Sequence, residues 1–148
     1  MNPWDIRTAL LAKHAQHVVL IHFPIALFLA GVGLDVAASI TRRRDLATAA
    51  YYNLTFAALS ALPAAATGLL AWQWELEGKR LKGILLYHLL AACTSLMLML
   101  AVWRTHTRVR RQPEQSLSSW RWPLQALAVL SVTLTGHLGG FLSGVNHP

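Results

Sequence analysis

Three histidines lie in segments of the sequence that are otherwise apolar: His22, His88 and His137. Imidazole is the commonest side-chain ligand of transition metals and also serves as an axial ligand of haem iron. A polar group in hydrocarbon is costly unless it has a partner. If the three imidazoles lie at one depth, they therefore favour a shared cofactor or a polar network. Their depth depends on the helices that carry them.

The composition indicates a membrane protein. The chain has 148 residues, of which 55% are hydrophobic and 13% charged, and its mean hydropathy is +0.42. A helix of about 20 apolar residues crosses roughly 30 Å of hydrocarbon. Four segments satisfy this length, and we expect helices at about 18–40, 51–72, 83–103 and 123–144. Short connections make neighbouring helices antiparallel. The predicted fold is all-α, a single membrane domain over residues 1–148 forming an up-and-down four-helix bundle.

Two further predictions concern the segments outside the four apolar runs. Asn2 as a cap and Pro3 at the first helical position predict a short interfacial helix over Pro3–Gln16. The polar stretch between the third and fourth apolar segments carries a proline and predicts one extended loop. No internal repeat is evident in the letters of the sequence.

The basic residues predict the orientation. Their net charge of +7 falls in clusters between apolar runs, so we expect them to contact the lipid bilayer and not nucleic acid. One side of the bundle would carry eight of them: Arg42, Arg43, Arg44, Arg104, Arg108, Arg110, Arg111 and Arg121. The other side would carry five: Arg7, Lys13, Lys79, Arg80 and Lys82. The positive-inside rule then places both termini on the periplasmic or external side.

The three histidines lie at similar depth in this arrangement. At 1.5 Å per residue, each falls roughly 6–10 Å below the outer surface. Small residues around His88 and His137 favour an inward orientation for both, and Gly68 on the second helix would leave space beside them. His17 is about 140° from His22 around the helix, so we expect it at the headgroup edge.

Several motifs resemble a known family. "HVVLIHFPIAL", "TGLLAW" and "TGHLGGFLSGVNH" are similar to sequences of an uncharacterised bacterial family of four-helix membrane proteins, and the similarity runs from His17 to His147. Members of that family carry a His-Phe-Pro-Ile-Ala-Leu signature and a Gly-His-Leu-Gly-Gly ending, and some are fused to c-type cytochrome domains. The family usually has proline after the first histidine, where this chain has Val18. The resemblance implies a bacterial inner-membrane protein in a redox setting and does not name a reaction.

The residues and the resemblance together predict a b-type cytochrome-like electron-transfer subunit, rather than a stand-alone enzyme. Because the first and third helices are diagonal in the bundle, we expect His22 and His88 to ligate haem b, with His137 near a propionate or as the alternative ligand. Lys79, Arg80 and Lys82 could pair with the propionates. The expected partner is a redox protein, such as a c-type cytochrome, or a larger membrane complex.

Two other classes stay open. His22, His88 and His137 could instead bind copper or zinc, since three imidazoles on one metal ion are a common set. Alternatively, the chain is a structural subunit of a larger redox complex and has no cofactor. Asp35 is the one acid inside an apolar span, and it either relays protons or reaches the interface near the inner end of its helix.

Overall fold

The computed structural model describes residues 13–75, 78, 80–112 and 117–144. It contains four helices in these ranges: α2 (Lys13–Thr41), α3 (Arg44–Glu75), α4 (Gly83–Arg111) and α5 (Arg121–Leu142). Each is long and apolar enough to cross a membrane. The predicted all-α class is therefore confirmed. Most of the predicted interfacial helix lies outside the described residues. Its last four residues, 13–16, form the start of α2.

Three of the described helices extend beyond the predicted apolar segments, and α5 has the predicted length but begins and ends two residues earlier. α2 ends at Thr41 and α3 begins at Arg44, with Arg42 between them in the left-handed region at φ 58°. α4 continues past Trp103 to Arg111, and its last turn carries three arginines. Cations stabilise a helix C-terminus because they oppose the helix dipole. The extended loop predicted after Trp103 is therefore wrong over its first part, which is helical.

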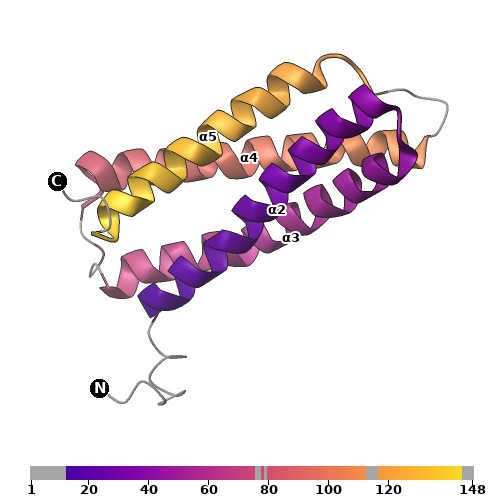
Figure 1. Ribbon diagram of the computed structural model, residues 1–148. Helices are drawn as coiled ribbons and strands as arrows, with labels where there is room; N and C mark the ends of the chain where they lie inside the picture. Colours follow the sequence, from indigo (N-terminus) through magenta and orange to yellow (C-terminus); the bar gives the residue numbers. More distant parts are fainter. Residues whose placement is uncertain (1–12, 76–77, 79, 113–116, 145–148) are drawn as a thin grey trace.

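The four helices form two antiparallel hairpins, α2 with α3 and α4 with α5 (Figure 1). The ends of the described chain lie at one end of the bundle, where the two hairpins diverge (Figure 1). They come together at the opposite end, near the α2–α3 and α4–α5 connections. Polar contacts between the hairpins at that end include the bond from Trp103 Nε1 to Thr55 Oγ1, at 3.2 Å.

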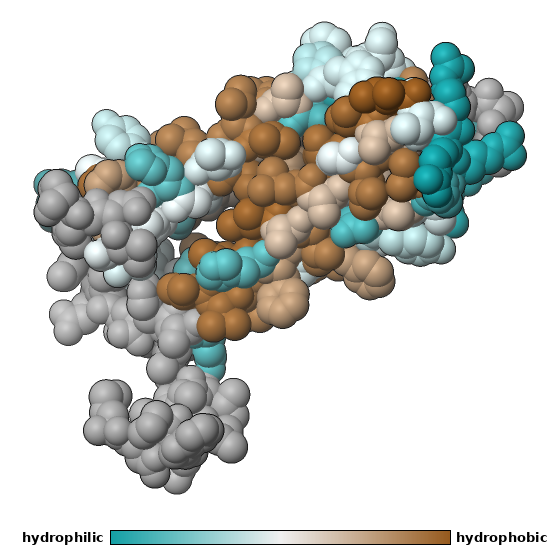
Figure 2. Space-filling model, in the orientation of Figure 1, coloured by the Kyte–Doolittle hydropathy of each residue, from teal (hydrophilic) through white to brown (hydrophobic). Residues whose placement is uncertain are grey.

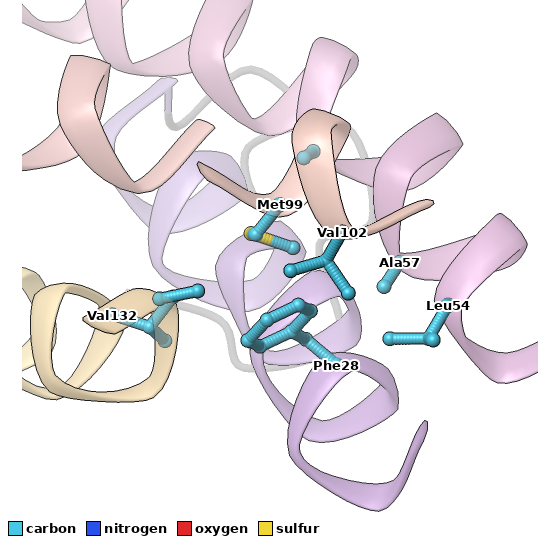
Figure 3. Close-up of a cluster of buried hydrophobic side chains, with 8 residues drawn as sticks. Phe28, Leu54, Ala57, Met99, Val102 and Val132 are labelled. Atoms are coloured by element: carbon cyan, nitrogen blue, oxygen red, sulfur yellow. The ribbon is translucent and has the colours of Figure 1, made fainter. Parts of the chain in front are cut away.

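A cluster of apolar side chains joins the hairpins halfway along the bundle. Phe28, Leu54 and Val102 are almost completely buried and pack together with Met99 and Val132 (Figure 3). Because these residues come from all four helices, the cluster closes the interior between the two ends. Any polar site at one end is separated from the other by this apolar layer.

The two hairpins repeat one pattern with an offset of 71 positions. His17 and His88 each contact a backbone carbonyl 47 residues further along the chain. The buried residues follow the same offset in seven further pairs: Pro24 and Ser95, Phe28 and Met99, Gly31 and Val102, Asp35 and His106, Leu54 and Gln125, Ala57 and Ala128, and Ala61 and Val132. The expectation of no repeat is therefore wrong. The repeat is hidden in the sequence because the paired positions share burial and seldom identity.

The surface matches a membrane environment. Large apolar residues are exposed along every described helix, and Figure 2 shows brown residues across the middle of the visible face, with hydrophilic residues gathered near the α2–α3 connection. Arg110 lies at this end over the rings of Tyr51 and Tyr52, 4.5 and 5.2 Å from their centroids. Arginine with tyrosine is typical of a membrane interface.

The charge asymmetry gives the first prediction. We expect a fluorescent protein that matures only in the cytoplasm to be dark when fused to the C-terminus, because the arginine-rich end retains the cytoplasmic position. The same reporter inserted in the α4–α5 connection should be bright. A bright C-terminal fusion with a dark loop insertion would invert the assigned orientation.

Candidate functional site

The first polar site lies in the α2–α3 hairpin, at the end near the termini. The half-buried His17 donates from Nδ1 to the carbonyl of Ala64 at 3.1 Å, and Nδ1 also lies 3.3 Å from Thr67 Oγ1. A Cβ at Gly68 would lie only 2.9 Å from His17 Cε1. His17 therefore faces α3, whereas its expected position at the headgroup edge stays a prediction. The space predicted at Gly68 exists, and the His17 imidazole fills it.

The equivalent site in the α4–α5 hairpin is built around His88. Its Nδ1 donates to the carbonyl of Thr135 at 3.1 Å, and a Cβ at Gly139 would lie 3.2 Å from its Cε1. The Thr135 hydroxyl also contacts the buried Ser95, which bonds Ser131, both at 2.9 Å. The structure thus confirms the inward orientation of His88 and fixes its ring within a small polar network.

The other two predicted ligands face outward. His22 is exposed, and its Nδ1 donates to the carbonyl of Val18 on its own helix at 2.7 Å. His137 is exposed and packs edge-to-face on Phe141, with ring centroids 5.0 Å apart. Their predicted inward orientation is wrong because each lies on the lipid-facing stripe of its helix. Within the described ranges, no three His, Cys, Asp or Glu side chains are placed to hold a metal ion.

The predicted propionate partners lie near the start of α4. Arg80 and Lys82 are exposed in the connection before α4, and Lys82 precedes the first helical residue with extended backbone. Lys79 lies outside the described residues. The two described side chains are therefore at the same end of the bundle as His88, and the structure is compatible with either headgroup or propionate contact.

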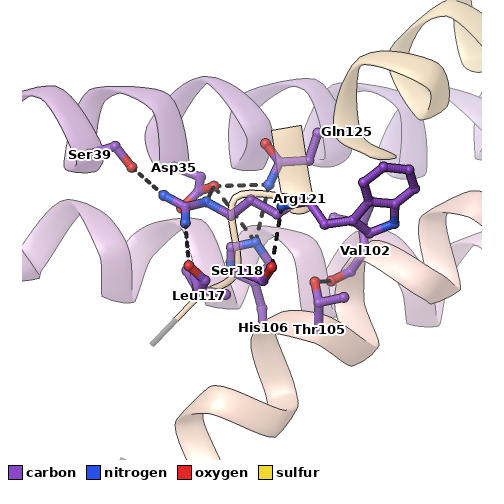
Figure 4. Close-up of polar contacts among 10 residues, drawn as sticks. Asp35, Ser39, Val102, Thr105, His106, Leu117, Ser118, Arg121 and Gln125 are labelled. Carbon is purple, nitrogen blue, oxygen red and sulfur yellow. Dashed lines mark hydrogen bonds and ion pairs between the residues drawn. The ribbon is translucent and has the colours of Figure 1, made fainter. Parts of the chain in front are cut away.

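A second polar site lies at the opposite end, between the hairpins (Figure 4). Asp35 on α2 is 2% exposed and accepts hydrogen bonds at Oδ2 from Arg121 Nε at 3.1 Å and from Gln125 Nε2 at 2.9 Å. His106 Nε2 lies 3.8 Å from the same carboxylate oxygen and 3.2 Å from Gln125 Nε2. Asp35 is therefore enclosed between the two hairpins and held by donors from α5.

Arg121 connects this site to the surrounding backbone. Its Nη2 donates to Ser39 Oγ at 2.6 Å and its Nη1 to the carbonyl of Leu117 at 3.0 Å. Its guanidinium also lies over the Trp122 ring, 4.1 Å from the centroid. With its side chain 13% exposed, Arg121 is the most exposed charged member of the site. We call Asp35, His106, Arg121 and Gln125 the inner polar cluster.

Sequence reasoning missed His17 as a packed residue and did not consider His106 and Gln125. The spacing of polar residues in the sequence could have identified the two histidines. Asp35 follows His17 by 18 residues and His106 follows His88 by the same number, which is five whole turns at 3.6 residues per turn. Each pair therefore shares one helix face. That spacing would have directed attention to His17, and away from His22.

Four apolar helices with buried polar residues at both ends define a polytopic membrane protein with two interior polar sites. The model of the family Predicted membrane protein (DUF2231) matches residues 13–146. The chain belongs to this family. No match was found among curated proteins or solved structures.

Proposed function

We propose that this protein is a membrane electron-transfer subunit that binds haem b through His17 and His88. One observation carries the proposal: the two hairpins hold imidazoles at equivalent positions, each oriented by a bond from Nδ1 to a carbonyl and packed on a glycine. These residues begin α2 and α4, at the end where the hairpins diverge (Figure 1).

The tautomer suits a ligand. Metal-bound histidines commonly donate their second ring nitrogen to a backbone carbonyl or carboxylate, which fixes the ring and raises its basicity. Donation from Nδ1 places the lone pair on Nε2, the atom that would coordinate iron. Glycine at positions 68 and 139 lets each ring approach the neighbouring helix closely, so the ring cannot turn without losing that contact.

This ligand pair revises the one predicted from the sequence. His88 is kept, and His17 replaces His22 because His22 lies on the lipid-facing stripe. His137 would take no part in ligation, and Arg80 and Lys82, with Lys79, remain the proposed propionate partners. Coordination by two imidazoles leaves no open position on the iron and supplies one-electron transfer, not substrate chemistry.

The proposal also implies a location for the haem site and a class of partner. The site lies at the end that the charge asymmetry places outside, in the inner membrane of a bacterium. A redox protein such as a c-type cytochrome, or a larger membrane complex, would exchange electrons there. Copper or zinc on the same two imidazoles is the alternative cofactor, and metal analysis distinguishes it from haem.

The glycines provide a graded test of the proposed site. Gly68→Ala should weaken haem binding by about 10–100-fold, since it displaces the orienting contact of a ligand. Gly139→Ala should have a smaller effect, because the new Cβ would meet His88 Cε1 at 3.2 Å and not 2.9 Å. Haem content per purified chain measures both.

Matched controls are available on α2 and α5. A Cβ at Gly33 or Gly136 would meet nothing within 4 Å, so Gly33→Ala and Gly136→Ala should keep the wild-type haem content. Equal haem content in all four variants would place the cofactor away from His17 and His88.

A further inference from the structure

We propose that the inner polar cluster is a proton-binding site, in which His106 accepts the proton and the Gln125 amide responds to it. The proposal does not depend on the haem site, which lies at the other end of the bundle beyond the apolar cluster of Phe28, Met99 and Val102.

The hydrogen bonds define the protonation state of the cluster as it stands. Gln125 Nε2 has two hydrogens and lies within bonding distance of both Asp35 Oδ2 and His106 Nε2. An amide nitrogen only donates, so both neighbours must accept. Asp35 Oδ2 is therefore an acceptor, and His106 is neutral with its hydrogen on Nδ1.

One atom in this arrangement is unsatisfied. Gln125 is 2% exposed, and its Oε1 has no hydrogen-bond partner. A buried polar atom without a partner costs about 1–3 kcal/mol, so such an atom requires an explanation. Protonation of His106 Nε2 supplies one, because it removes an acceptor of the Gln125 amide and leaves that amide to adopt another arrangement.

The repeat shows that the cluster departs from its symmetric counterpart. Asp35 and His106 occupy equivalent positions in the two hairpins, as do Leu54 and Gln125. One hairpin thus has an acid where the other has a base, and leucine where the other has an amide. The acid, the base and the amide lie together and form a set in which a proton can be shared.

The charges facing His106 come from two helices. α2 contributes Asp35, and α5 contributes Arg121. α3 has the buried apolar residues Ala50 and Leu54 at the positions equivalent to Arg121 and Gln125, so it adds no titratable group there. The cluster is neutral as it stands, with one carboxylate and one guanidinium.

Proton uptake changes one bond. A proton from water adds to the lone pair of His106 Nε2, and the net charge of the cluster rises by one. Asp35 keeps its contact with Arg121 and lies 3.8 Å from the imidazolium, close enough to attract it. Nε2 then becomes a donor and can no longer accept from the amide. Histidine is the side chain whose ordinary range of titration allows this exchange near neutral pH.

The test is nitrogen NMR of the full chain in lipid nanodiscs, with histidine labelled in both ring nitrogens and the pH varied from about 5 to 8. We expect His106→Gln to remove one imidazole that converts from the Nδ1–H form to the imidazolium. His22→Gln removes a histidine outside the cluster and should leave that transition unchanged.

Two variants should move the transition in opposite directions. Asp35→Asn should lower the pH of His106 protonation by at least about one unit, because an opposite charge within about 4–6 Å favours the charged form. Gln125→Leu should raise it, because a hydrogen bond to the neutral form is removed. Gln125→Leu also copies Leu54 of the other hairpin, so it preserves packing if Asp35→Asn fails to fold.

A purely structural cluster gives a different result. His106 would then stay neutral across the pH range in the wild type and in Gln125→Leu, which would overturn the proposal. A shift in the same direction in both variants would equally contradict it.

Discussion

Asp35→Leu should lower the free energy of unfolding by about 3–5 kcal/mol, because it leaves the Arg121 guanidinium without its carboxylate inside the protein. The carboxylate also accepts from Gln125, so a second buried donor loses its partner. Asp35 belongs to the α2–α3 hairpin while Arg121 and Gln125 belong to the other. The two hairpins should therefore separate at a lower concentration of denaturant in a detergent-micelle unfolding titration.

Asp45→Asn is the matched control. Asp45 pairs with Arg43, but both side chains are more than half exposed, so the change should leave the unfolding midpoint where it is. The double variant Asp35→Leu with Arg121→Met should recover much of the loss, since an apolar replacement of a whole buried pair is often neutral. A double variant no more stable than Asp35→Leu alone would show that the charge left behind is not the cause.

His17→Ala and His88→Ala should each abolish the low-spin haem spectrum, because either change removes one of the two proposed ligands. Each also removes a ring that is held by a carbonyl and a glycine, and alanine can supply neither the ligand nor the contact. Absorption spectra of the oxidised and reduced variants, normalised to protein, measure the effect.

His22→Ala and His137→Ala are the controls for that prediction. Both side chains are exposed, and we expect both variants to keep the wild-type spectrum. If His22→Ala loses haem while His17→Ala retains it, the ligand pair expected from the sequence alone is restored and the revised pair is wrong. If all four variants bind as the wild type does, none of these histidines is a ligand.

The fold followed from the sequence because hydrophobic length is a strong local signal. Four apolar segments and short connections suffice to predict an antiparallel bundle, and three of the described helices are longer than predicted. Arg104 to Arg111 were assigned to a loop from their charge. They are helical because arginine is a good helix former and is favoured near a helix C-terminus.

The sites were harder to predict because they depend on rotation of each helix about its axis. His22 and His17 are both near the start of α2, and only the packing of α2 on α3 decides which one faces the interior. A proline two residues after His22 gave no indication of that face. The 18-residue spacing from each packed histidine to a second polar residue carries the information, but it becomes evident only when the two hairpins are compared.

The inner polar cluster shows a second limit of prediction from the sequence. Asp35 was visible as the one acid in an apolar span, whereas its partners are spread over α4 and α5. Arg121 was interpreted as a topology signal, and Gln125 drew no attention among the apolar residues of its helix. Pairing between distant segments depends on the register between the hairpins, which no local pattern specifies.

The central claim is that the chain holds haem b on two imidazoles, and one measurement addresses it directly. The absorption spectrum of the purified full-length protein, produced with haem available and recorded oxidised and then dithionite-reduced, should show a low-spin b-type signature with about one haem per chain, as expected for a single pair of axial ligands. A chain that is folded, as judged by its helical circular dichroism, and that shows no haem absorbance in either state would contradict the claim.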